Sequence, residues 1–157
     1  MIFPEDACKA EPRITIDQAH SRLSVDETLL RRVVEYVLEG ERRNPDLLGI
    51  VLIERAAMQA LNKRWRDSDY DTDVLSFPLG PEKAIGGEIF VNLDFAYDHC
   101  TEFGATFIQE VCRYVAHGVL HLIGYDDATD AGRHQMQRLE DRYLAGAGII
   151  KAAAAAP

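Results

Sequence analysis

Two histidines stand four residues apart in an apolar stretch, and two aspartates follow a glycine a few residues later. The stretch is residues 117–127, HGVLHLIGYDD. Side chains at positions i and i+4 of an α-helix lie on the same face, so His117 and His121 can bind one metal ion. Gly124 can end this helix in a left-handed cap, after which the chain can turn back and offer a carboxylate. The spacing therefore predicts a metal-binding helix.

Asp126 or Asp127 can supply a third ligand to such an ion. Three protein ligands leave one position of a tetrahedral metal open to water, which is the arrangement of catalytic zinc sites. His134, on the next predicted helix, is an alternative third ligand, although the pattern of that helix points it outward. The competing interpretation is a buried helix with two incidental histidines, which requires the spacing, the helix stop and the carboxylates to coincide by chance.

Gly118 excludes one class of metal enzyme. In metallopeptidases with an HExxH helix, the glutamate directly after the first histidine is the general base. This chain has Gly118 at that position, so a peptidase of this kind would lack its base. Phosphodiester cleavage makes a different demand, because charge builds up on phosphate oxygens and positioned cations stabilise it.

The length and composition are those of an ordinary globular protein. The chain has 157 residues, 47% of them hydrophobic and 27% charged, and we expect a single domain over residues 1–157. Residues 1–12 and 148–157 show no packing pattern and predict poorly ordered tails. No apolar run approaches the ~20 residues of a membrane helix, and no secretory signal is evident. We therefore expect a cytoplasmic protein with no membrane partner.

Charge and cysteine usage narrow the function further. The net charge of −9 argues against indiscriminate binding of nucleic acid, which depends on cations that neutralise phosphates, but it permits a local basic cleft. Cys8, Cys100 and Cys112 show no CxxC spacing, so neither a disulfide framework nor a cysteine-zinc ribbon is indicated. Cys112 lies on an apolar helical stripe and is predicted to be a core residue.

Strand and helix patterns alternate irregularly along the chain. Strands are predicted at 13–17, 47–53, 74–77 and 88–92, the last two as an antiparallel hairpin. Helices are predicted after Ser24, at 55–66, at 93–100, after Thr106 and at about 129–144. The order predicts an α+β fold, with a small mixed sheet of about four strands packed with about five helices.

Two of these helices begin with a capping-box pattern, Ser24 with Glu27 and Thr106 with Gln109. The second of them carries the histidines. Its predicted core stripe is Ile108, Val111, Cys112, Val115, Val119 and Leu122. The residues predicted to fall on or near the other side are Glu110, Arg113, Tyr114, His117 and His121. The histidines can therefore line a cleft.

The stretch 117–127 resembles the signature of the YbeY family of metal-dependent bacterial endoribonucleases. It matches every fixed position except the last, where the family has a histidine and this chain has Asp127. Residues 61–66 (LNKRWR) followed by 72–78 (TDVLSFP) are similar to the family's second signature, in the expected order and separation. Met136 and Glu140 fit its final helix. The resemblance covers roughly residues 45–145.

The resemblance implies an α+β domain, a zinc ion held by three histidines and cleavage of single-stranded RNA. It also implies maturation of the 3′ end of the small-subunit (16S) rRNA and ribosome quality control, with the ribosomal small subunit and its proteins as partners. Here His117, His121 and Asp127 become the ligand set. A carboxylate is an accepted zinc ligand, but it lowers the charge of the site from about +2 to +1 and makes another divalent metal more acceptable.

The same resemblance favours Arg66 as a catalytic residue beside His117 and His121. Its planar guanidinium suits bidentate phosphate contact, whereas chemistry alone favours a surface ion pair with Asp67 or Asp69. Asp126 is predicted to orient an imidazole N–H. Weaker candidates for the RNA path are Arg42, Arg43, Arg55, Lys63 and Arg64.

The leading hypothesis is therefore a metal-dependent endoribonuclease that acts on ribosomal RNA. One alternative is a metal-dependent hydrolase of another phosphoester or amide substrate. A second, of a different class, is a ribosome-assembly or RNA-binding protein whose metal site is structural or weakened, which the replacement at Asp127 suggests. Restoring a histidine there distinguishes an enzyme from a binding protein.

Overall fold

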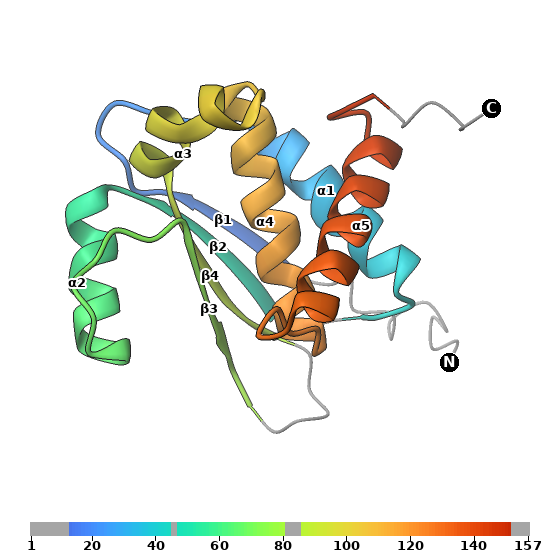
Figure 1. The fold of residues 1–157 in the computed structure, drawn as a ribbon, viewed down its shortest axis with the longest axis horizontal. Coiled ribbons are helices and arrows are strands. Elements are labelled where there is room, and N and C mark those ends of the chain that lie inside the picture. Colours follow the sequence, from blue (N-terminus) through green and yellow to red (C-terminus); the bar gives the residue numbers. More distant parts are fainter. Residues whose placement is uncertain (1–12, 45–46, 81–85, 152–157) are drawn as a thin grey trace, which may run out of the picture.

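The computed structural model of the chain describes residues 13–44, 47–80 and 86–151. Within these ranges it forms five α-helices and one four-stranded mixed sheet, which confirms the predicted α+β fold (Figure 1). The strands are β1 (Arg13–Gln18), β2 (Leu47–Ile53), β3 (Val74–Pro78) and β4 (Gly86–Asn92). The α-helices are α1 (Glu27–Gly40), α2 (Arg55–Arg66), α3 (Leu93–His99), α4 (Phe107–Ile123) and α5 (Asp130–Gly146), with a 3₁₀ turn, η2 (Cys100–Phe103), after α3.

The sheet has the order β1-β2-β4-β3. Strands β1, β2 and β4 run parallel, and β3 pairs antiparallel with β4. The predicted hairpin of residues 74–77 and 88–92 is therefore confirmed. Its position leaves β3 at the edge of the sheet, next to the helix that carries the histidines.

Helices cover the two faces of the sheet unequally (Figure 1). Helices α1, α4 and α5 lie on one face, and α2 lies on the other. The main core lies under α1 and α4 and includes Leu48, Ile50, Leu52, Ile89 and Val91 from the sheet. A smaller cluster of Ile53, Met58 and Leu75 lies under α2. Burial of each such side chain stabilises the fold by about 1.5–3 kcal/mol, so α4 is held firmly against the sheet.

The face prediction for α4 was only partly right. Cys112 is fully buried, as predicted, but Ile108 is 42% exposed. Glu110 and Tyr114, predicted on or near the opposite side from the core, are 3% and 5% exposed. The reason is that α4 is covered on more than one side. The ring of Tyr114 packs against Phe95 of α3, with the ring centroids 6.3 Å apart.

Helix α1 begins differently from its prediction. Its N-cap is Asp26, whose carboxylate accepts a hydrogen bond from the Thr28 N–H. The predicted capping box of Ser24 with Glu27 is therefore wrong, because an aspartate two residues later is an equally good cap and sits closer to the first apolar turn. Since Val25 is buried, it anchors the chain just before this start.

The chain stays packed beyond α5. The Ile149 N–H donates to the Leu144 carbonyl, and Gln109 Nε2 donates to the Ile149 carbonyl. Ile149 and Ile150 pack against the main core. A tail that starts at residue 148 was therefore predicted too early, while residues 1–12 and 152–157 lie outside the described residues. In the described part of the chain, no helix is long and apolar enough to cross a membrane.

Candidate metal centre

Helix α4 begins and ends as its sequence predicts. Thr106 and Gln109 form a capping box at its start, in which each side chain accepts a hydrogen bond from the other residue's backbone N–H. Gly124 ends the helix with φ +119, in the left-handed region that glycine adopts without strain. The Gly124 N–H donates to the Leu120 and His121 carbonyls. The chain then turns back beside the last turn of α4.

This reversal brings Asp127 to the two histidines. His117 Nε2 lies 3.0 Å from His121 Nε2. Asp127 Oδ2 lies 3.4 Å from His117 Nε2, and Asp127 Oδ1 lies 3.5 Å from His121 Nε2. A zinc ion with bonds of ~2.0–2.1 Å holds tetrahedral ligands roughly 3.3–3.4 Å apart. The three donor atoms are thus spaced as one ion requires.

The contacts of the two Nδ1 atoms indicate how the imidazole rings are oriented toward the site. His121 Nδ1 lies 3.0 Å from the Tyr125 carbonyl oxygen, and His117 Nδ1 lies 3.6 Å from Glu140 Oε2. Since the Tyr125 carbonyl only accepts, His121 Nδ1 carries the hydrogen and the neutral ring presents its Nε2 lone pair to the site. The Glu140 carboxylate favours the same tautomer of His117. Two Nε2 atoms 3.0 Å apart need a shared proton or a metal cation between them, because two bare lone pairs at that distance repel each other. The geometry therefore fits a bound metal ion.

The carboxylates around His117 make the site favourable for a positive charge. Burial lowers the pKa of His117, but Glu140, Asp127 and Asp73 outweigh that effect and raise the pKa above its usual value. The same negative potential that favours a proton on the imidazole favours a metal cation in its place. Among the described residues, His117, His121 and Asp127 form the group that could hold a metal ion.

Gly118 is explained by how closely α4 approaches the sheet. A Cβ at this position would lie 2.7 Å from Ile89 Cγ2 and 3.1 Å from Ser76 Oγ. Ser76 Oγ also donates to the Gly118 carbonyl at 3.3 Å. A glutamate therefore has no room between the helix and β3 or β4. The peptidase-type general base is absent for a steric reason, in agreement with the sequence.

The three residues open into a cavity of about 580 Å³, which we call the metal cavity. It is lined by Arg66, Thr72, Asp73, Val74, Ser76, Pro78, His117, His121, Leu122, Asp126 and Asp127. Arg66 ends α2, yet it shares this cavity with the histidines of α4. Arg66 is exposed, and within the described ranges it forms no ion pair. The alternative pairing with Asp67 or Asp69 is not seen.

Other predicted residues take different places. The Asp126 carboxylate accepts from the Ala128 N–H, and His134 is exposed. Arg55 is engaged in the protein itself, with Nε 2.8 Å from Asp71 and Nη2 2.5 Å from Asp98. The orienting role expected of Asp126 falls instead to Glu140 and to the Tyr125 carbonyl. Sequence reasoning missed Glu140 in this role, although its place in the final signature helix was a signal.

A protein-family model described as Endoribonuclease YbeY matches residues 14–148. The chain belongs to the endoribonuclease YbeY family. Members of this family are nucleases that hydrolyse phosphodiester bonds of RNA, and the metal centre and Arg66 lie inside the matched region. The resemblance noted in the sequence is thus confirmed over nearly all of the described chain.

Individual relatives agree with the family match. An "Endoribonuclease YbeY" from Salinibacter ruber is 41% identical over 140 residues, which cover 83% of this chain and 89% of the relative. A relative of the same name from Chlorobium phaeovibrioides is 35% identical, and the match covers 82% of this chain and 88% of the relative. Another from Carboxydothermus hydrogenoformans is 33% identical, and the match covers 85% of this chain and 96% of the relative. The solution structure of TM1509 from Thermotoga maritima is similar at a TM-score of 0.61 and 28% identity, covering 87% of this chain and 88% of that one.

Proposed function

We propose that this chain is a metal-dependent endoribonuclease that cuts single-stranded RNA with one zinc ion held by His117, His121 and Asp127. Its place in the YbeY family supports the ribonuclease class. The observation that carries the metal assignment is the pair of Nε2 atoms 3.0 Å apart, with a carboxylate beside both. Asp127 occupies the third ligand place, which supports a complete ligand set in spite of the missing family histidine.

The family also supports a cellular role and place. We propose that the substrate is the small-subunit rRNA, that the cleavage matures its 3′ end, and that the enzyme contributes to ribosome quality control. The ribosomal small subunit and its proteins would then be its partners, in the cytoplasm. Contact with a ribosomal protein would also overcome the repulsion between RNA and a chain whose net charge is −9.

Residues of the chain have separable tasks in this reaction. A bound zinc ion supplies a Lewis acid for the phosphate and lowers the pKa of a bound water. Arg66 lines the same cavity and pairs with no acidic group among the described residues, so its planar fork is available to hold a phosphate oxygen. Glu140 and the Tyr125 carbonyl keep the imidazoles in the tautomer that presents Nε2. Ser76 and Gly118 fix the distance between α4 and β3.

The direct test is cleavage of an end-labelled single-stranded RNA by purified protein, with metal content measured on the same samples. Zinc should copurify or titrate at one ion per chain, and His121→Ala should abolish both metal and cleavage. Arg66→Ala should retain the metal but lose at least roughly tenfold in cleavage, because the lost contact acts on the phosphate. Cleavage that persists in His121→Ala would mean that another nuclease is present.

Asp127→His separates the enzyme from the weakened binding protein. If the natural site is a working nuclease, this variant should bind zinc and change cleavage only modestly. A gain of several orders of magnitude would show that the natural chain is a poor nuclease, and the binding role would then be favoured. Mapping of rRNA 3′ ends in cells that carry only the Arg66→Ala chain tests the substrate, since unprocessed ends should accumulate.

A further inference from the structure

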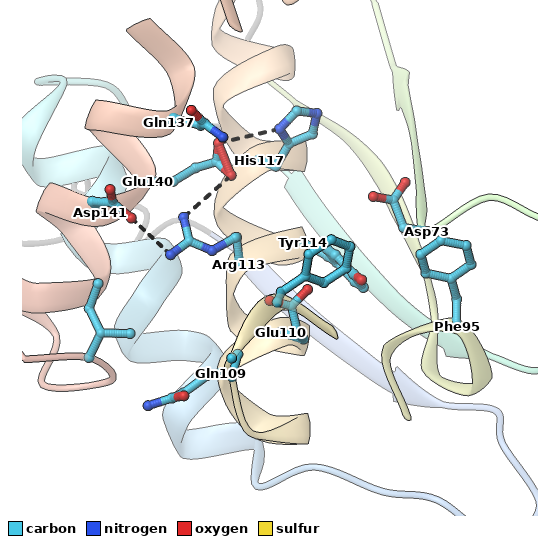
Figure 2. A pocket seen from close by; sticks show the side chains of 14 residues that line it. Asp73, Phe95, Gln109, Glu110, Arg113, Tyr114, His117, Gln137, Glu140 and Asp141 are labelled. Carbon is cyan, nitrogen blue, oxygen red and sulfur yellow. Dashed lines mark hydrogen bonds and ion pairs between the residues drawn. The ribbon is translucent and has the colours of Figure 1, made fainter. Parts of the chain in front are cut away.

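A second cavity lies beside the metal centre, and no ligand has been assigned to its interior so far. Its volume is about 660 Å³, and it lies between α3, the η2 turn, α4 and α5 (Figure 2). We call it the lateral cavity. His117 and Asp73 line both this cavity and the metal cavity, so the two are neighbours on one surface. A ligand that reaches the metal can extend into the lateral cavity.

Two polar side chains in the lateral cavity are buried without an evident structural purpose. Glu110 and Tyr114 are 3% and 5% exposed, and both line the cavity from successive turns of α4 (Figure 2). Within the described residues the Tyr114 hydroxyl makes no well-formed hydrogen bond, and burial together with the neighbouring Glu110 carboxylate raises the pKa of Tyr114. Burial raises the pKa of Glu110, because its charged form has lost water. The buried Tyr114 hydroxyl is costly unless a ligand supplies a hydrogen bond to it.

The charge of the cavity indicates what that ligand is. Arg113 pairs with Glu140 and Asp141, at 3.9 Å and 2.8 Å. Its charge also acts on Glu110, but neither Asp73 nor Glu110 forms an ion pair with any described residue. Such a cavity repels a phosphate and favours a neutral group that carries N–H donors. A metal is not favoured either, because in the described part of the chain the ligand group with metal spacing is the one at His117.

Aromatic side chains favour a planar ligand. Phe103, at the end of η2, lines the cavity yet is 62% exposed. Phe95 and Tyr114 form an edge-to-face pair on its wall, with the rings at 62°. Exposed aromatic rings beside a groove are the surfaces on which single-stranded nucleic acids stack their bases. The lateral cavity therefore favours a ligand that is uncharged, planar and able to donate N–H hydrogen bonds. A nucleobase has all three properties.

The spacing along α4 places such a base next to the reacting phosphate. Glu110, Tyr114, His117 and His121 are at positions i, i+4, i+7 and i+11, and so form one stripe of the helix. With a rise of ~1.5 Å per residue, Tyr114 and Glu110 lie about 4.5 and 10.5 Å along the axis from His117. That span corresponds to the reach of one nucleotide from its phosphate to the far edge of its base.

We propose that the lateral cavity is a guanine-binding subsite for the nucleotide next to the scissile phosphate, an inference that rests on the proposed ribonuclease function. Guanine presents two adjacent donors, N1–H and the N2 amino group, beside the O6 acceptor. The Glu110 carboxylate accepts from the two donors, and the Tyr114 hydroxyl donates to O6. Adenine, cytosine and uracil each lack the pair of adjacent donors that a carboxylate accepts with both oxygens.

Four single-stranded RNAs test the assignment, identical except for guanine, adenine, cytosine or uracil at the positions flanking one cleavable bond. The zinc-loaded protein should cut the guanine substrate roughly tenfold faster or more. Glu110→Gln and Tyr114→Phe should lose most of this preference, because the first replaces one accepting oxygen with an N–H donor and the second removes the hydroxyl that donates to O6. Glu35→Gln makes the same chemical change on an exposed position of α1 and should keep the preference.

A second arm uses guanosine and adenosine, which carry the base without a phosphate. Guanosine should shift the NMR signals of Tyr114 and Phe103 and bind tighter than adenosine. If the wild type cuts none of the RNAs, the nuclease proposal fails, while selective guanosine binding still supports the subsite. Equal cutting of the four RNAs, or an unchanged preference in both folded variants, overturns the subsite and leaves the nuclease intact. If Glu110→Gln does not fold, the base preference of Tyr114→Phe alone tests the subsite, because this variant keeps the buried ring and should fold.

Discussion

Glu140 Oε2 lies 3.6 Å from His117 Nδ1, and this pair joins α5 to the metal centre on α4. The other oxygen of Glu140 lies 3.9 Å from Arg113 Nη1, and Arg113 Nη2 lies 2.8 Å from Asp141 (Figure 2). Glu140 is 5% exposed. A buried carboxylate held by an arginine and an imidazole has little freedom, so it sets the orientation of the His117 ring.

Glu140→Gln should weaken zinc binding by ~10–100-fold, because the negative charge and one accepting oxygen beside His117 Nδ1 are lost and the NH₂ group of the amide can take that place. Metal affinity is measured by competition with a chromogenic chelator, and folding by circular dichroism. Asp141→Asn is the matched control, since it changes the exposed partner of the same arginine and should leave zinc affinity within about twofold. Equal losses in the two variants would show that the arginine, not the imidazole contact, carries the effect.

Gly118→Ala should destabilise the fold by about 1–3 kcal/mol, because the new Cβ would lie 2.7 Å from Ile89 Cγ2. The helix must then move away from β4, which displaces His117 as well. Urea unfolding of the metal-free protein measures the free-energy change. Gln135→Ala, on an exposed position of α5, should change stability by less than about 0.5 kcal/mol. An unchanged unfolding midpoint in Gly118→Ala would contradict the close approach.

Asn92 should be among the most sensitive polar positions. Its side chain is fully buried, donates to Asp71 and to the Thr72 carbonyl, and accepts from the Phe95 N–H as the cap of α3. Asn92→Ala leaves these groups without a partner, and we expect a loss of about 2–4 kcal/mol. Thermal and urea unfolding measure it. Cleavage should fall too, because Asn92 holds the loop that leads to Asp73 on the metal cavity.

Cys112 should be unreactive in the folded protein. Burial raises the pKa of its thiol to about 12, so at pH ~8 the nucleophilic thiolate is nearly absent. Treatment with iodoacetamide, followed by mass spectrometry of the peptide that contains Cys112, should show slow labelling. The same peptide should be labelled rapidly in denaturant, where the pKa returns to its ordinary value. Fast labelling of the native protein would mean that α4 opens readily.

The sequence predicted the parts of the site that depend on local geometry. The i, i+4 spacing of His117 and His121, the stop at Gly124 and the return of Asp127 are all set within eleven residues. Periodicity could not predict Glu140, because its contact with His117 depends on how α5 packs across α4. It also misplaced Tyr114, since an amphipathic pattern assumes one buried face and α4 is covered by α3 and α5 as well as by the sheet.

Asp127 lies on the short connection between α4 and α5, residues 124–129, while the other two ligands belong to α4 alone. The spacing of the three donor atoms therefore depends on how those two helices are seated against each other. Any substitution that tilts α5, even at Leu144 in its buried last turn, would change the triangle of donors. If the proposed site holds an ion, its affinity would therefore change with helix packing far from the metal.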